Sequence, residues 1–260
     1  MSITLLTETW LAGEQPVVPL WDRASVEVYG ETNVGRVRES NQDCFGIRED
    51  LGLFIVADGV GGHAGGELAS QMAVHAVESE VAARVQDLSA RVASVRQQVF
   101  SQSINVASLK IFERSLELPQ YRGMATTLTS LWIPTRETRD SIDSGVVAHV
   151  GDSRCYLLRT GFLYQLTDDH SFINEQIKLG RLKPTDPIVS QIKNVITRCV
   201  GNQEEEEIDT RSIKLFSGDK FLLCSDGLSS KVSEEEIAET LSNNTPREAC
   251  GKLIRLANDR

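Results

Sequence analysis

The apolar run LGLFIVAD, Leu51 to Asp58, constrains the fold more than any other stretch of this 260-residue chain. Most of its positions are apolar in succession, without the alternation of a strand that has one face in water. Such a run predicts a strand buried on both faces, so further layers of secondary structure need to cover it. The run ends in a carboxylate, Asp58, which needs a partner if it is buried with the strand.

The other expected elements follow in blocks, not in a repeating strand–helix alternation. The expected strands are residues 26–33, 44–47, 51–58, 126–133, 144–150, 153–159, 162–167, 207–215 and 220–226. The expected helices are one from Glu67 through Val81 and those over 91–112, 233–241 and 246–257. This order predicts an α+β fold. Residues 1–25 contain two prolines and show no period, so we interpret them as an N-terminal extension to a domain over residues 26–260.

Composition excludes several classes of protein. The formal net charge of −10 argues against a nucleic-acid partner, because phosphate backbones require basic patches. The five cysteines are scattered and form no C-x-x-C pair, which is typical of reduced thiols and argues against a disulfide framework or a zinc site. The sequence shows neither an apolar run of membrane-spanning length nor an export signal. We therefore expect a cytoplasmic monomer that has no membrane partner.

An aspartate ends each of three apolar strands that lie far apart in the sequence. Asp58 follows LFIVA, Asp152 follows VVAHVG and Asp226 follows KFLLCS. Any one of them alone would be interpreted as turn chemistry, since Asp and Gly are common turn residues. Three together favour a cation site, because hard ions such as Mg²⁺ and Mn²⁺ bind carboxylate and carbonyl oxygens.

The residues around Asp58 add candidate chemistry. Gly59 has no side chain, so its carbonyl can approach a metal closely. His63 lies in the following glycine-rich stretch and is a candidate proton donor, although a lone histidine is as often a surface residue. Upstream, GRVRESNQD offers Arg38 and Asp43; arginine can hold phosphate through two hydrogen bonds, but such a pair alone is usually surface charge.

Seven motifs in order along the chain carry a resemblance to a known family. They are RESNQD, VADGVGGHAGGE, MATTL, AHVGDSRCYLLR, QLTDDHS, ITRCVG and DKFLLCSDGL. Together they resemble the metal-dependent protein phosphatase family (PPM, type 2C) in its bacterial branch. The resemblance implies a four-layer α/β/β/α sandwich of two antiparallel sheets flanked by helices. It also implies hydrolysis of phosphoserine and phosphothreonine by a metal-activated water, without a phospho-enzyme.

The resemblance further implies a metal centre with two Mg²⁺ or Mn²⁺ ions. Asp58 would bridge the two metals, and the Gly59 carbonyl would complete one coordination shell. Asp226 would bind the other metal, and Asp43 would hold metal-bound waters. Asp152 would support a third, weaker site together with Asp226.

The same resemblance gives roles to the substrate-facing residues. Arg38 would bind the substrate phosphate, and His63 would protonate the leaving serine or threonine oxygen. Residues 171–194 stand where the family carries its flap subdomain. Phosphorylated proteins would be the partners, together with a cognate serine/threonine kinase.

One departure from the family pattern leaves a second interpretation open. The family continues past its last helix with a glycine-rich turn, an Asp-Asn pair and a final strand, whereas this sequence stops at LANDR, so that turn and strand are absent. Asn258-Asp259 has the reversed order and is not expected to replace the missing ligand. The favoured interpretation is that the sequence stops short of the end of the domain. The alternative function is a pseudophosphatase, a regulatory binding module with a weakened metal centre.

Overall fold

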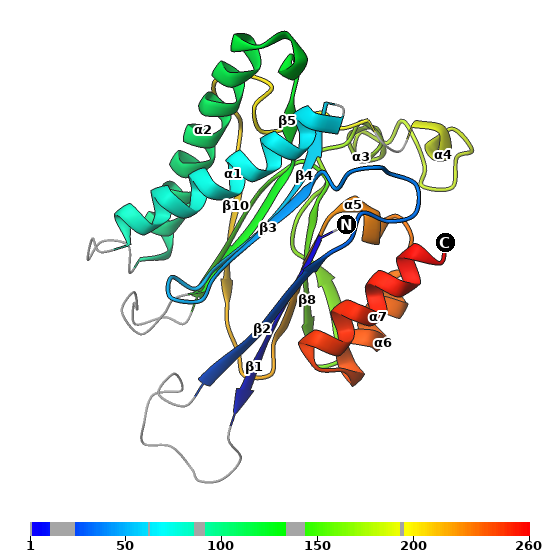
Figure 1. The fold of residues 1–260 in the computed structure, drawn as a ribbon. Helices are drawn as coiled ribbons and strands as arrows, with labels where there is room; N and C mark the ends of the chain where they lie inside the picture. Colours follow the sequence, from blue (N-terminus) through cyan, green and yellow to red (C-terminus); the bar gives the residue numbers. More distant parts are fainter. Residues whose placement is uncertain (1, 11–23, 62, 86–91, 134–143, 193–194) are drawn as a thin grey trace.

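Two antiparallel sheets lie face to face in the computed structural model, which describes residues 2–10, 24–61, 63–85, 92–133, 144–192 and 195–260 (Figure 1). One sheet has the order β2 (Ala24–Thr32), β1 (Ser2–Trp10), β11 (Lys220–Cys224), β8 (Arg154–Arg159) and β9 (Phe162–Gln165). The other has the order β10 (Asp209–Lys214), β7 (Ser144–Val150), β6 (Leu128–Trp132), β4 (Leu53–Val60) and β3 (Asp43–Arg48), and the short β5 (Ala125–Thr126) also pairs with β4.

Helices cover the outer face of each sheet (Figure 1). α1 (His63–Arg84) and α2 (Ala93–Glu117) lie on the sheet that contains β4. α6 (Glu234–Asn243) and α7 (Pro246–Asn258) lie on the sheet that contains β11. The shorter helical turns are η3 (Pro119–Tyr121), α3 (Phe172–Lys178), α4 (Val189–Ile192) and α5 (Asp226–Ser229). The predicted α/β/β/α sandwich is confirmed.

The central strand β4 is buried on both faces, as its apolar run predicts. Leu53 and Ile55 pack under α1 and α2, whereas Phe54 and Val56 pack against the other sheet. All four side chains are almost completely excluded from solvent. The alternation of side chains along a strand thus divides one apolar run between two cores.

A third core lies between the β11 sheet and the C-terminal helices. Tyr156 and Leu222 point from that sheet toward Ile237 of α6 and Leu253 of α7. A capping box on Ser233 begins α6, as its sequence predicts. Four layers therefore enclose three apolar interfaces, as a sandwich of this kind requires.

The interpretation of residues 1–25 as irregular is wrong for Ser2–Trp10. These residues form β1, which pairs with β2 from Ser2↔Thr32 to Trp10↔Ala24 and with β11 from Ile3↔Cys224 to Thr7↔Lys220. Its neighbour β11 is more than 200 residues away in sequence, so local pattern could not reveal the pairing. Residues 11–23 lie outside the described part of the chain.

Two details of the first helices also differ from expectation. α1 begins at His63, so Glu67 lies beyond its first turn. Within the helix expected over residues 91–112, the apolar side chains of Val92 and Leu109 are exposed. The buried face instead contains larger residues such as Phe100 and Ile104. The helix is therefore oriented about its axis so that its larger apolar side chains face the sheet. None of the helices in the described ranges has the length and hydropathy that a bilayer span requires.

Shortening Phe54 to alanine tests the interface between the sheets. Phe54 is 1% exposed and Phe162 is 66% exposed. We expect Phe54→Ala to lower the free energy of unfolding by about 3–5 kcal/mol, because it removes buried apolar surface and leaves a cavity. Urea denaturation measures this loss. The control Phe162→Ala should change stability by less than about 0.5 kcal/mol, and equal losses would contradict the layer assignment.

Candidate active site

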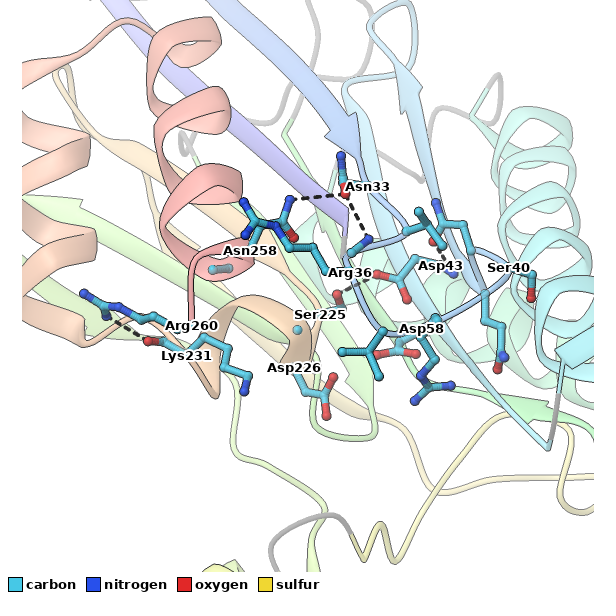
Figure 2. Close-up of a pocket in the computed structure, with 18 residues that line it drawn as sticks. Asn33, Arg36, Ser40, Asp43, Asp58, Ser225, Asp226, Lys231, Asn258 and Arg260 are labelled. Carbon is cyan, nitrogen blue, oxygen red and sulfur yellow. Dashed lines mark hydrogen bonds between the residues drawn. The ribbon is translucent and has the colours of Figure 1, made fainter.

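Two predicted ligands lie opposite each other on neighbouring strands. Asp43 opens β3 and pairs in register with Asp58 of β4. Asp58 has the same parity as Phe54 and Val56, so it continues the face of β4 that points toward the other sheet. Figure 2 shows Asp43 and Asp58 beside each other in a pocket. The site therefore lies at one end of the apolar layer between the two sheets.

Asp226 reaches the same pocket from the second sheet. It begins α5, separated by one residue from the end of β11, and it lines the pocket with Asp43 and Asp58 (Figure 2). The preceding residue, Ser225, donates a hydrogen bond from its hydroxyl to Asp43 Oδ2 at 2.6 Å. This bond joins the ends of the two sheets. The sequence analysis gave Ser225 no role, because a serine beside an aspartate carries no signal by itself.

The Thr126-Thr127 pair holds the main chain of Asp58. The Asp58 amide donates to Thr127 Oγ1 at 3.0 Å. In return the Asp58 carbonyl accepts from the Thr127 amide at 2.8 Å and from Thr126 Oγ1 at 2.9 Å. Both threonines are completely buried. The motif MATTL was the only signal of this role in the sequence.

Gly59 and Gly66 approach each other through their backbones. A Cβ built on Gly59 would lie 2.0 Å from the Gly66 carbonyl oxygen and 2.7 Å from that of Gln42. A Cβ on Gly66 would lie 2.9 Å from the Gly59 carbonyl oxygen. No side chain fits at either position. Glycines are thus required where the start of α1 packs directly against the backbone of β4.

The carboxylates interact with one another electrostatically. Burial, with Asp43 and Asp226 nearby, raises the pKa of Asp58 well above its usual range. Burial, with Asp226 nearby, raises the pKa of Asp152 to about 7. Asp152 follows β7 and is only 9% exposed. Among the described residues, no Lys or Arg forms an ion pair with Asp58, Asp152 or Asp226.

This donor set fits hard divalent cations. Asp43 of β3, Asp58 of β4 and Asp226 of α5 line one pocket, and such ions prefer oxygen ligands. Asp152, in the turn after β7, is not among the lining residues but interacts electrostatically with Asp226 and Asp58. Burial first and the neighbouring carboxylates second raise the pKa values of Asp58 and Asp152, and a cation would offset both effects by stabilising the charged carboxylates. Among the described residues, a second group of possible ligand atoms lies outside this pocket. It consists of His149, His170 and Asp209, whose ligand atoms lie within 4.8 Å of one another.

Positive side chains also line the pocket, whose volume is about 290 Å³. Arg38 lies there as predicted, exposed to solvent. Arg36 and Lys231 line it as well and were missed by the sequence analysis. Arg36 is held by Asp259 at 2.8 Å. The pocket thus combines carboxylates at its base with cations at its rim, which suits an anionic substrate bound to a metal.

A model of the family described as Protein phosphatase 2C matches residues 35–249, which contain all of the predicted site residues. The chain belongs to the protein phosphatase 2C family. It is similar to protein phosphatase PhpP of Streptococcus pneumoniae, at 34% identity over 232 residues that cover 88% of this chain and 89% of the relative. It is similar to serine/threonine phosphatase stp of Listeria monocytogenes, at 34% identity over 231 residues that cover 87% and 88%.

Solved structures of protein phosphatase 2C relatives share the fold. The Streptococcus agalactiae serine/threonine phosphatase superposes with a TM-score of 0.76 at 33% identity, over 88% of this chain and 91% of that chain. The catalytic domain of the serine/threonine protein phosphatase PstP, solved in complex with two manganese ions, superposes with a TM-score of 0.71 at 27% identity, over 99% and 93%. By family the chain is therefore an enzyme, a protein phosphatase.

Two predicted features of this phosphatase need separate comment. The side chain of His63 lies outside the described part of the structure, and its main chain is the first residue of α1. Asp259, at the end of α7, is 66% exposed and bound to Arg36. Asn258 donates to Asn33 Oδ1 at 3.2 Å. Both residues are thus engaged with the 33–36 loop.

The stability of the metal-free phosphatase should depend on Asp152. Its folded-state pKa of about 7 exceeds the ordinary carboxyl value, so between about pH 4 and pH 7 the folded chain binds more protons than the unfolded chain. Stability should therefore fall as pH rises through this window, by up to about 1.4 kcal/mol per pH unit, and should level off above it.

Urea unfolding in EDTA at pH 5, 6 and 7 measures this slope. Asp152→Asn removes the titrating group and should flatten the dependence. Asp58 also has a raised pKa, so a residual slope of the same sign is expected in the variant. Parallel curves for the two proteins would show that Asp152 titrates normally.

Proposed function

We propose that this chain hydrolyses phosphoserine and phosphothreonine in proteins, with a divalent metal centre held by its strand-end aspartates. The observation that carries the proposal is the convergence of Asp43, Asp58 and Asp226 from two sheets into one pocket whose rim carries Arg38. Residues with no other common purpose meet there. The names of the relatives, protein phosphatase and serine/threonine phosphatase, support the same reaction.

Asp58 and Asp226 would be direct ligands of two Mg²⁺ or Mn²⁺ ions, with the carbonyl of Gly59 completing one shell. Asp43, oriented by Ser225, would hold water molecules of that shell. Asp152 and Asp226 would serve a third, weaker site. When bound, such ions supply a nucleophilic water of lowered pKa and positive charge at the phosphoryl oxygens. The main-chain clamp of Thr126 and Thr127 keeps Asp58 in position for this role.

Arg38 would bind the phosphoryl group of the substrate. Its guanidinium is exposed on the pocket rim and can donate two parallel hydrogen bonds to phosphate oxygens. His63 would donate the proton to the leaving serine or threonine oxygen, since it begins the helix seated next to Gly59. Residues 171–194 would form a flap beside the pocket, and a serine/threonine kinase would supply the phosphorylated substrates. We expect a cytoplasmic monomer.

The regulatory alternative is not favoured by the comparisons. The relatives are named as phosphatases, and the chain retains Arg38 together with the aspartates. A binding module that holds phosphoproteins without cleaving them has no need of a carboxylate cluster.

Replacing Asp226 by asparagine tests the metal assignment. The variant keeps the shape of the side chain but loses its charge, so we expect kcat/KM to fall by about 100-fold or more. The substrates are p-nitrophenyl phosphate and a phosphothreonine peptide, each assayed with Mn²⁺ and then with EDTA. EDTA should abolish wild-type turnover. Turnover near the wild-type level in Asp226→Asn would show that the aspartate is not a ligand.

Removing the guanidinium of Arg38 tests phosphate binding. Arg38→Ala should raise KM for the phosphopeptide by about 10-fold, the value of a lost charge-assisted hydrogen bond. Arg36→Ala is the matched control, because Arg36 lies two residues away in the same pocket but is held by Asp259. Its KM should stay within about threefold of wild type. If both variants behaved alike, the rim as a whole, not Arg38, would bind the phosphate.

A further inference from the structure

A buried pair of histidines lies behind the turn that carries Asp152. The rings of His149 and His170 stack with centroids 4.7 Å apart, and they are 4% and 3% exposed. His170 Nε2 is 3.4 Å from Asp209 Oδ2 and makes no hydrogen bond among the described residues. Two imidazoles beside a carboxylate resemble a transition-metal site.

The hydrogen bonds of His170 argue against a metal there. Its Nδ1 accepts the amide N–H of Gly151 at 3.1 Å, so that nitrogen carries no proton. Burial, with His149 and Arg198 nearby, lowers the pKa of His170 to about 4, so the ring is neutral near pH 7. The single ring proton therefore sits on Nε2, facing Asp209. A metal on Nε2 would require a ring with no proton at all.

The same ring and its own main chain hold Gly151 from two directions. The His170 amide donates to the Gly151 carbonyl at 2.9 Å, while Nδ1 receives the Gly151 N–H. Gly151 has φ of +104°, and a Cβ there would lie 2.6 Å from a methyl carbon of Thr127. His170 thus binds both main-chain polar groups of the residue before Asp152, and Thr127 leaves no room there for a side chain.

The residue after Asp152 is fixed as well. Ser153 Oγ lies 2.7 Å from Thr127 Oγ1, and its carbonyl accepts from Thr129 Oγ1 at 2.7 Å. All three residues are buried. Asp152 therefore stands between two clamped neighbours. The clamp on Ser153 belongs to the strand network that also holds Asp58, whereas the clamp on Gly151 depends on His170.

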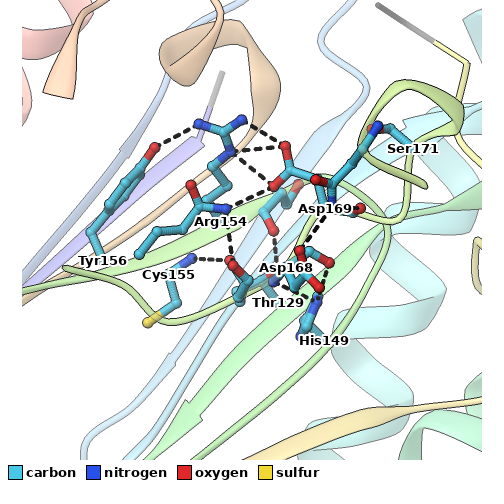
Figure 3. A network of polar contacts seen from close by, with 12 residues as sticks. Thr129, His149, Arg154, Cys155, Tyr156, Asp168, Asp169 and Ser171 are labelled. Atoms are coloured by element: carbon cyan, nitrogen blue, oxygen red, sulfur yellow. Dashed lines mark hydrogen bonds and ion pairs between the residues drawn. The ribbon is translucent and has the colours of Figure 1, made fainter. Parts of the chain in front are cut away.

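His170 is itself tied to the rest of the site. Its carbonyl accepts the Thr197 amide at 2.9 Å, and Ser171 bridges Ile196, which closes the base of the 171–194 segment. Asp209 is held by Arg198 at 3.0 Å. Figure 3 shows the neighbouring contacts of this region. The ring of His149 lies within hydrogen-bond distance of the Asp168 carbonyl, and the Arg154 guanidinium donates to the Asp169 carboxylate.

We propose that His170 is a positioning residue for Asp152: its ring Nδ1 and its main-chain amide bind the N–H and the carbonyl of Gly151, the residue before Asp152. The inference rests on the proposed function, because it takes Asp152 to be a metal ligand. It assigns the histidine of the QLTDDHS motif to the orientation of a carboxylate 18 residues earlier in the chain. Loss of Nδ1 should release the turn and weaken metal binding at Asp152, not the chemistry of the other ligands.

Mn²⁺ titration of the metal-free chain by calorimetry is the test. Asp152→Asn defines which part of the Mn²⁺ binding depends on Asp152. His170→Leu, which has no acceptor, should weaken that same part by about 10-fold or more. His170→Asn places an amide oxygen where Nδ1 stood and should stay within about threefold of wild type. The double variant Asp152→Asn/His170→Leu should bind Mn²⁺ no more weakly than Asp152→Asn alone.

A stability control separates positioning from general loosening of the fold. Ile104→Val shortens a core side chain of α2 and should lower the thermal unfolding midpoint without changing Mn²⁺ affinity. If His170→Leu binds Mn²⁺ as wild type does, or if His170→Asn is no better than His170→Leu, the inference is overturned. A metal bound by Asp152→Asn but lost in His170→Leu would overturn it in favour of a site on the histidines themselves.

The proposed function can fail separately. Wild-type chain that neither binds Mn²⁺ nor hydrolyses the phosphopeptide would refute the function. Wild-type chain that does both, while Asp152→Asn binds Mn²⁺ normally, would refute only the positioning role.

Discussion

Burial of β4 on both faces is the constraint on which the rest of the structure depends. Because neither face of this strand can meet water, one sheet face requires the α1–α2 layer and the other requires a second sheet. That second sheet in turn needs α6 and α7 on its outer face. The strand also continues past its apolar part to Asp58, so the same requirement that builds the sandwich delivers a carboxylate to the end of its inner layer. Fold and site are thus consequences of one segment.

The site is built from groups that oppose one another until a cation joins them. Burial, and after it the repulsion between neighbouring carboxylates, raises the pKa values of Asp58 and Asp152. Hydrogen bonds hold them there nonetheless: Thr127 binds the main chain of Asp58, and the Ser225 hydroxyl donates to the Asp43 carboxylate. In the proposed function, this arrangement lowers stability but preorganises oxygen ligands for a cation. A net charge of −10 is compatible with phosphate binding for the same reason, since local cations reverse the sign of the field.

Residues outside the carboxylates give the site its specificity of position. Gly59 and Gly66 let the first turn of α1 lie directly against β4, closer than any side chain would allow. Gly151 does the same for the turn after β7, where the Thr127 side chain leaves no room for a Cβ. His170 then binds both the N–H and the carbonyl of Gly151. At Gly59, Gly66 and Gly151, the lack of a side chain therefore allows neighbouring segments to pack closely.

The sequence by itself determined the elements whose cause is local or periodic. It predicted a two-sided buried strand at β4, the capping box of α6 and an aspartate at the end of three strands, and the motifs in order identified the family. Tertiary structure alone decided what depends on partners far away in the chain. Ser2–Trp10 became a strand because β2 and β11 supply hydrogen bonds on both of its edges. The sheet that α2 packs against determined which of its apolar residues are buried. The contacts of Ser225, Thr127 and His170 likewise depend on partners that are distant in sequence. The sequence shows that a hydroxyl or an imidazole is present, but only the folded chain shows which group it binds.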